Sequence, residues 1–275
     1  MLRSVLVHVD ASQRCHARLL AARNLARRHE ARLTALFADS PLELDSPFGY
    51  AAGSSGVQWL QQMELDRRAN AKHRFETVIG ASSQANWSEL NGEAPAFGVA
   101  RHALCADLVV LGQHESLGAE ASGLPDDFVE SVIIASGRPA LVLPRNGGLA
   151  TPPATIVIAW KASSASAHAL AGALPLLRLA RDVHVVSWAE TAAQGPHDGD
   201  EVLGYLQLHG VHAQWQQHTK APRDICQALL AHCVAMQADL LVMGCYSHAR
   251  MRERLLGGVT RDMLRTMTLP VLMAH

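Results

Sequence analysis

The chain has few aromatic residues, no long apolar run and no excess of either charge. Aromatics make up 5% of the 275 residues, which argues against a stacking platform for single-stranded nucleic acid. Lys and Arg number 24 against 25 Asp and Glu, so the net charge is -1, whereas binding to nucleic acid needs a basic surplus or a basic face. Because 49% of the residues are hydrophobic and 18% charged, the composition predicts a globular protein with a sizeable core.

Signals for a membrane or for secretion are also missing. Apolar runs such as 108–111 and 240–243 have the length of strands, whereas a spanning helix needs about 20 residues. The first residues lead directly into Val5-Leu6-Val7 without the basic and apolar regions of a signal peptide. These absences predict a protein that stays in the cytoplasm and contacts neither membrane nor nucleic acid.

The cysteines form no pattern of their own. There are five, an odd number, and no two of them form a C-x-x-C pair. In a reducing compartment this predicts small buried side chains rather than disulfides or a redox centre. The cysteines are Cys15, Cys105, Cys226, Cys233 and Cys245.

What the chain does contain is a repeat of itself. Residues 106–112 (ADLVVLG) match 238–244 (ADLLVMG), and each half closes on an apolar run led by Pro139 or Pro270. A period of this length is typical of a duplicated domain rather than of a solenoid. Gly- and Pro-rich residues at 144–153 place the joint near 148. We therefore expect two domains, 1–147 and 148–275.

Each half alternates short apolar runs with longer helical patterns. This alternation predicts parallel strands joined by right-handed crossovers, and five strands a half predict a doubly wound sheet of flavodoxin-like or Rossmann-like type. The expected strands are 4–9, 33–37, 85–90, 107–111, 140–143, 155–160, 183–188, 211–217, 239–243 and 270–274. The expected helices are 13–29, 57–79, 95–105, 126–136, 164–180, 199–209, 223–236 and 257–267. Residues 40–56, rich in Gly, Ser and Pro, are expected to form a mobile loop over the sheet edge, either a lid or a variable insertion.

A glycine-containing segment follows the fourth strand of the second half. Gly244 is followed, three positions on, by Ser247. After nine intervening residues comes the pair Gly257-Gly258, which is expected to open a helix. Glycines let the backbone approach a phosphate closely, and a helix N-terminus directs free N–H groups at an anion. By spacing alone, such glycines more often serve tight packing or a turn than an anion site.

This segment, followed by a helix and Pro270-Val271-Leu272, resembles the universal stress protein family, in particular its tandem two-domain bacterial members. The resemblance implies an α/β fold that binds an adenine nucleotide such as ATP, a role in stress survival, and dimerisation, often through the last strand. It also implies an Asp near the ligand after the first strand. The candidate nucleotide-binding residues are Met243, Gly244, Ser247, Gly257, Gly258, Val259, Thr260 and Asp10.

The chain departs from that family's pattern in both halves. Ser247 stands in place of a glycine, Gly258 in place of a hydroxyl residue, and Trp160 in place of the second half's Asp. The first half keeps Asp10 but has Asp126-Asp127 where a glycine pair is expected, and two carboxylates would repel phosphate. We therefore expect no ATP in the first half and weak or no binding in the second.

Other clusters favour ordinary structural roles. His209 and His212 are separated by a glycine that ends the helix, so no metal site is expected among the 15 histidines. Cys226 and Cys233 share a helix face, as core residues do. Four arginines surround the glycine loop and would either attract an anion or form a solvated face. They are Arg250, Arg252, Arg254 and Arg261.

No catalytic constellation is present, since the chain lacks a nucleophile elbow, a P-loop and a dinucleotide fingerprint. The sequence thus favours a binding or regulatory module over an enzyme. The alternatives are a nucleotide-free scaffold that works through protein contacts and a slow ATPase. Pairing of 140–143 with 270–274 about a pseudo-twofold axis is expected, either inside one chain or between two chains.

Overall fold

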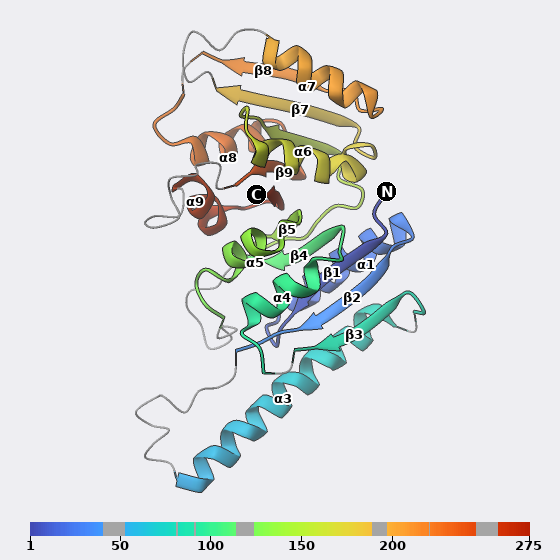
Figure 1. The fold of residues 1–275 in the computed structure, drawn as a ribbon, viewed down its shortest axis with the longest axis vertical. Helices are drawn as coiled ribbons and strands as arrows, with labels where there is room; N and C mark the ends of the chain where they lie inside the picture. Colours follow the sequence, from blue (N-terminus) through green and yellow to red (C-terminus); the bar gives the residue numbers. More distant parts are fainter. Residues whose placement is uncertain are drawn as a thin grey trace.

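The computed structural model describes residues 1–40, 53–80, 82–90, 92–113, 124–188, 197–219, 221–245 and 258–275. Strands and helices alternate through both halves (Figure 1). The first half contains β1 (Ser4–Val9), α1 (Cys15–His29), β2 (Arg32–Phe37), α3 (Gly53–Ile79), β3 (Ala85–Glu89), α4 (Pro95–Ala103), β4 (Leu108–Gly112), α5 (Phe128–Ser136) and β5 (Ala140–Leu143). The second half contains β6 (Thr155–Ala159), α6 (Ser164–Leu177), β7 (Asp182–Trp188), α7 (His197–Leu208), β8 (Gln214–His218), α8 (Ile225–Ala235), β9 (Leu240–Gly244), α9 (Gly258–Thr266) and β10 (Val271–Ala274).

The strands of the described residues join in one ten-stranded sheet, in the order β3-β2-β1-β4-β5-β10-β9-β6-β7-β8. Within each half all neighbouring strands are parallel, and the order is the same in both halves. The doubly wound α/β fold expected from the repeat is therefore confirmed. The order reverses direction between β1 and β4, and again between β6 and β9.

The two halves meet through their last strands. β5 and β10 are antiparallel, with Val142 opposite Val271 and Leu141 opposite Leu272, and all four side chains are fully buried. The expected pseudo-twofold pairing thus occurs inside one chain. Because β5 and β10 run in opposite directions, the strands of the first half point their carboxyl ends one way along the strand axis, and those of the second half point theirs the other way.

Helices cover both faces of the sheet and bury a core on each. One core packs under α1, α3, α6 and α7, and the other under α4, α5, α8 and α9. Each core contains strand residues from both halves. Strands buried on both faces explain the continuous apolar runs such as 108–111 and 240–243.

The expected elements agree with the structure apart from their ends. The expected loop at 40–56 is wrong for 53–56, because α3 already begins at Gly53. Gly and Ser have low helix propensity, but in a first turn the long helix-forming stretch that follows outweighs that cost. Residues 41–52 lie outside the described residues. The five cysteines are free, and Cys105 is exposed in the turn after α4, so the expectation of burial is wrong for it.

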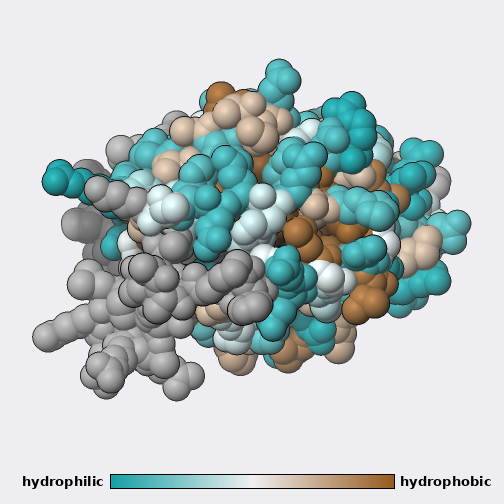
Figure 2. All heavy atoms as spheres, turned by 90° about the horizontal axis from the view of Figure 1, so that it is seen from above, coloured by the Kyte–Doolittle hydropathy of each residue, from teal (hydrophilic) through white to brown (hydrophobic). Residues whose placement is uncertain are grey.

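The ends of the sheet carry polar side chains. β8 is an edge strand on which Gln214, Gln216 and Gln217 are exposed. Seen along the long axis, the surface is mainly hydrophilic, with apolar residues gathered in a smaller area (Figure 2). Polar side chains on an edge strand discourage pairing with a second sheet. Among the described helices, none is long and apolar enough to cross a membrane.

Candidate functional site

Each half has one place where a ligand is expected. In open parallel sheets, ligands bind beyond the carboxyl ends of the strands, where the strand order reverses. In the first half this point lies between β1 and β4, next to Asp10 and Gly112. In the second half it lies between β6 and β9, next to Trp160 and Gly244. The side chains at these two points differ between the halves.

In the first half the carboxylate at this point is paired inside the chain. Arg18, from the first turn of α1, places its guanidinium 2.6 Å from Asp10 Oδ1, and the two side chains are only 7% and 2% exposed. Ser12 donates two further hydrogen bonds to the same oxygen, from its hydroxyl at 2.6 Å and its backbone N–H at 3.0 Å. Burial works to raise the pKa of Asp10, but Arg18, His8 and these hydrogen bonds lower it well below its usual range.

The Arg18 side chain also fills the space beside β4. A side chain at Gly112 would collide with the Arg18 guanidinium, so glycine at the end of β4 makes room for this arginine. The place where a ligand would meet Asp10 and Gly112 is therefore occupied by the protein itself. Asp10 is thus held in an internal ion pair, and its expected contact with a nucleotide stays a prediction.

The opposite side of the same point is filled by His8. Its ring packs on Phe128, the first residue of α5, with centroids 4.8 Å apart, and its Nε2–H donates to the Ala38 carbonyl at 2.8 Å. Burial and the charge of Arg18 lower the pKa of His8 to about 4, against the opposing effects of Asp10 and the Ala38 hydrogen bond. At neutral pH this histidine is therefore uncharged.

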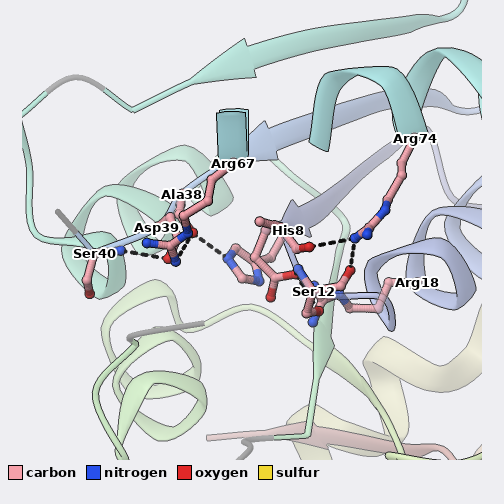
Figure 3. A network of polar contacts seen from close by, with 10 residues as sticks. His8, Ser12, Arg18, Ala38, Asp39, Ser40, Arg67 and Arg74 are labelled. Carbon is pink, nitrogen blue, oxygen red and sulfur yellow. Dashed lines mark hydrogen bonds and ion pairs between the residues drawn. The ribbon is translucent and has the colours of Figure 1, made fainter. Parts of the chain in front are cut away.

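Helix α3 contributes two arginines to the same network of polar contacts (Figure 3). Arg67 forms an ion pair with Asp39, which follows β2, and Arg74 donates to the carbonyls of Ala11 and Ser12. Burial raises the pKa of Asp39 to about 7, although Arg67 works against it. The first half thus ends in a buried network of its own charges rather than in an open site.

The His8 environment predicts a loss of stability in acid. A histidine whose folded-state pKa is depressed contributes stability above its unfolded pKa, and this is lost as the pH falls toward the folded value. The window here runs from pH 6.5 to about 4 and corresponds to about 3 kcal/mol in free energy of unfolding. Urea unfolding of the wild type and of His8→Leu over this range measures it, since the variant lacks this titration.

The raised pKa of Asp39 changes the free energy of unfolding with pH in the opposite direction to His8, so the comparison of wild type with His8→Leu needs a control. An acid with a raised pKa destabilises the fold as the pH rises from its ordinary value of 3.8 to about 7. Asp39→Asn should therefore steepen the acid loss of stability that His8→Leu removes. If wild type and His8→Leu showed parallel pH profiles, the buried neutral His8 would be contradicted.

In the second half the residues at the corresponding point are arranged differently. Met243 is 5% exposed and belongs to the core under α8 and α9. A Cβ at Gly244 would lie 2.5 Å from the backbone nitrogen of Ser166, in the first turn of α6. The absent side chain of Gly244 therefore serves the close approach of α6, and its use in phosphate binding stays a prediction.

The start of α9 contains the other candidate residues of the second half that the structure describes. Gly258 is the exposed first residue of α9, and a Cβ there would meet nothing closer than Asp262 Oδ2 at 3.9 Å. The first turn of α9 contains no acidic residue. Val259 is half-buried against the core, and Thr260 is 4% exposed. A helix N-terminus can bind an anion through its N–H groups, and such a role for the start of α9 stays a prediction, because the residues before Gly258 lie outside the described residues.

The corresponding helix of the first half begins differently. Asp127 is the N-cap residue of α5 and Glu130 lies in its first turn. Ser131 donates from its hydroxyl to Asp127 at 3.2 Å. Carboxylates at a helix N-terminus satisfy the dipole and repel phosphate. The two helices thus differ as the sequence predicts.

Some candidate residues cannot be placed. Ser247 and Gly257 lie outside the described residues, as do Arg250, Arg252 and Arg254. Asp10 does not share a site with the second-half residues, because three strands separate β1 from β9, a distance of roughly 19 Å at the usual strand spacing. Among the residues that the structure describes, no three His, Cys, Asp or Glu side chains are grouped to hold a metal ion.

The sequence analysis missed the residues that close the first half. These residues come from three elements and one connecting segment and form no linear motif: they are His8 in β1, Arg18 in α1, Asp39 after β2, and Arg67 and Arg74 in α3. One signal was present, because Arg18 falls on the buried face of α1 that contains Cys15, Ala22 and Leu25. A charged residue on an apolar helix face needs a buried partner.

Comparison with known proteins supports the fold. No family model and no curated protein matches the chain. A universal stress protein from Archaeoglobus fulgidus has a TM-score of 0.70 at 13% identity, over 98% of this chain and 95% of that one. A Pseudomonas aeruginosa PAO1 protein of unknown function has a TM-score of 0.58 at 15% identity, over 99% and 92% of the two chains. A proposed universal stress protein from P. aeruginosa UCBPP-PA14 also has a TM-score of 0.58, at 16% identity over 99% and 93%.

The chain therefore has a doubly wound α/β fold built twice into one sheet. This is the fold of a universal stress protein of similar length, as the resemblance in the sequence indicates.

Proposed function

We propose that this protein is a cytoplasmic stress-response module of universal stress protein type, in which only the second half binds an adenine nucleotide, and binds it weakly. The observation that carries the proposal is the buried Arg18–Asp10 pair. It fills the ligand place of the first half, whereas the residue at the corresponding point of the second half is the uncharged Trp160. The nucleotide would act as a signal rather than as a substrate.

The open start of α9 supports the location of the phosphates. Gly258 is exposed, and the first turn of α9 contains no acidic residue that would repel a phosphate from the positive end of the helix dipole. Low affinity follows from two other features. Gly244 is already packed against the α6 backbone, and Trp160 offers no carboxylate to a ribose.

The same two features favour a second candidate, a scaffold that binds no nucleotide. In that case Gly244 would have a packing role alone, and the protein would work through contacts with other proteins. A nucleotide retained through purification would count against the scaffold.

The variant Gly258→Asp tests the nucleotide proposal. It gives α9 the carboxylate that α5 has at Asp127, and we expect ATP affinity to fall at least about tenfold through repulsion at the helix start. The fold should keep its stability, because Gly258 is exposed and an acid at a helix N-terminus is favourable. Isothermal titration calorimetry and thermal unfolding measure the two quantities.

The matched control is Asp127→Asn, which removes a carboxylate at the start of the corresponding helix in the first half. This variant should leave ATP affinity unchanged, since the first half takes no nucleotide. Equal affinities of wild type and Gly258→Asp would show that the start of α9 is not the phosphate site.

A further inference from the structure

Trp160 stands at the reversal point of the second half with an unused hydrogen-bond donor. It follows β6 directly, and its backbone N–H donates to the Val186 carbonyl at 2.8 Å. The ring is half-buried against the core under α6 and α7. Its Nε1–H, however, is buried and has no hydrogen-bond partner among the residues that the structure describes. A buried donor without a partner destabilises a fold, so its presence at a ligand position needs an explanation.

In the first half, the polar side chain at the corresponding position has a partner within the chain. There Asp10 follows β1, and Arg18 of α1 pairs with it. Arg18 stands nine residues after the end of β1, and His168 stands nine residues after the end of β6. His168 is exposed, and its Nδ1 hydrogen-bonds the carbonyl oxygen of His275 at 2.8 Å. Helix α6 therefore gives Trp160 no counterpart of the internal pair.

The hydrogen-bonding character of the two positions is also reversed. Asp10 accepts hydrogen bonds, whereas the Trp160 indole only donates them. A ligand at the second position must therefore offer an acceptor. In an adenine nucleotide the acceptors are ring nitrogens of the base and oxygens of the ribose and of the phosphates.

We propose that the Trp160 Nε1–H donates a hydrogen bond to an acceptor atom of the nucleotide bound by the second half. The proposal rests on the proposed function and names a contact of that same site. Because the nitrogen is covered in the free protein, the neighbouring chain must shift before the acceptor reaches it. This is a further reason for low affinity.

The test is Trp160→Phe, which keeps an aromatic ring and removes the donor. We expect ATP to bind about tenfold more weakly, the upper end of what one net hydrogen bond contributes. The melting temperature of the free variant should equal or exceed that of the wild type, because an unsatisfied donor has been removed. A residue with only a structural role would lower the melting temperature and leave the affinity unchanged. Titrations with ATP and with adenosine locate the acceptor, since a deficit that persists with adenosine places it on the nucleoside and a deficit confined to ATP places it on a phosphate.

Trp87→Phe is the matched control in the first half. The Trp87 Nε1–H donates to Glu89 Oε1 at 2.7 Å, so this variant should lose stability and keep wild-type ATP affinity. If Trp160→Phe bound ATP as tightly as a binding-competent wild type, the contact would be disproved while the proposed function stood. If the wild type itself bound neither ATP nor adenosine, both the Trp160 contact and the proposed nucleotide binding would be disproved.

Discussion

Replacing Arg18 by Met should destabilise the protein by about 3–5 kcal/mol, the loss typical of leaving one partner of a buried ion pair behind. Met keeps most of the volume of the side chain next to Gly112 but leaves the Asp10 carboxylate buried without its cation. The pKa of Asp10 should then rise, because burial works in that direction once Arg18 is absent. The variant should consequently regain stability as the pH falls. Urea unfolding at several pH values measures both effects.

The surface pair Arg101–Glu93 provides the control for this result. Its charged atoms also lie 2.6 Å apart, but the two side chains are 51% and 34% exposed. Arg101→Ala should therefore lower the free energy of unfolding by less than about 1 kcal/mol. The double variant Arg18→Met with Asp10→Asn should recover part of the loss, since it removes the orphaned charge. Similar losses for Arg18→Met and Arg101→Ala would contradict a closed first half.

Gly244→Ala should lower stability by about 3 kcal/mol, because the new methyl group has nowhere to go. Its Cβ would lie 2.5 Å from Ser166 N and 2.6 Å from the Ala165 carbonyl carbon, and both atoms belong to backbone. α6 would have to move away from β9, against which it packs. Thermal and urea unfolding measure the loss.

A second glycine separates this steric effect from glycine's general flexibility. Gly204 lies inside α7, and a Cβ there would meet nothing within 4 Å. Gly204→Ala should therefore stabilise the protein by up to about 1 kcal/mol through helix propensity. Were Gly244→Ala tolerated as well as Gly204→Ala, the close approach of α6 to β9 would be wrong.

The fold was predictable because its signals are local and occur twice. Continuous apolar runs mark strands buried on both faces, and the matching segments at 106–112 and 238–244 mark the duplication. The pairing of β5 with β10 followed from the need to cover an edge strand. The sequence left open whether one chain or two would supply that pair, because both arrangements bury the same side chains.

The site was less predictable, because its chemistry depends on contacts between distant elements. Asp10 reads as a ligand residue in the sequence, and only the position of Arg18 beside it shows that the chain neutralises it. Gly244 reads as a phosphate-binding glycine, yet its space is taken by the α6 backbone. In contrast, the difference between Asp127 and Gly258 was readable directly, since a helix start depends on local residues.

The number of adenine nucleotides bound per chain tests the account most directly. Equilibrium dialysis of nucleotide-free protein against saturating labelled ATP measures this number, and mass spectrometry of freshly denatured protein shows whether nucleotide is retained through purification. The account predicts one weak site per chain, lost in Gly258→Asp and kept in Asp127→Asn. Two sites per chain would contradict the closed first half, and no site at all would contradict nucleotide binding and leave the scaffold.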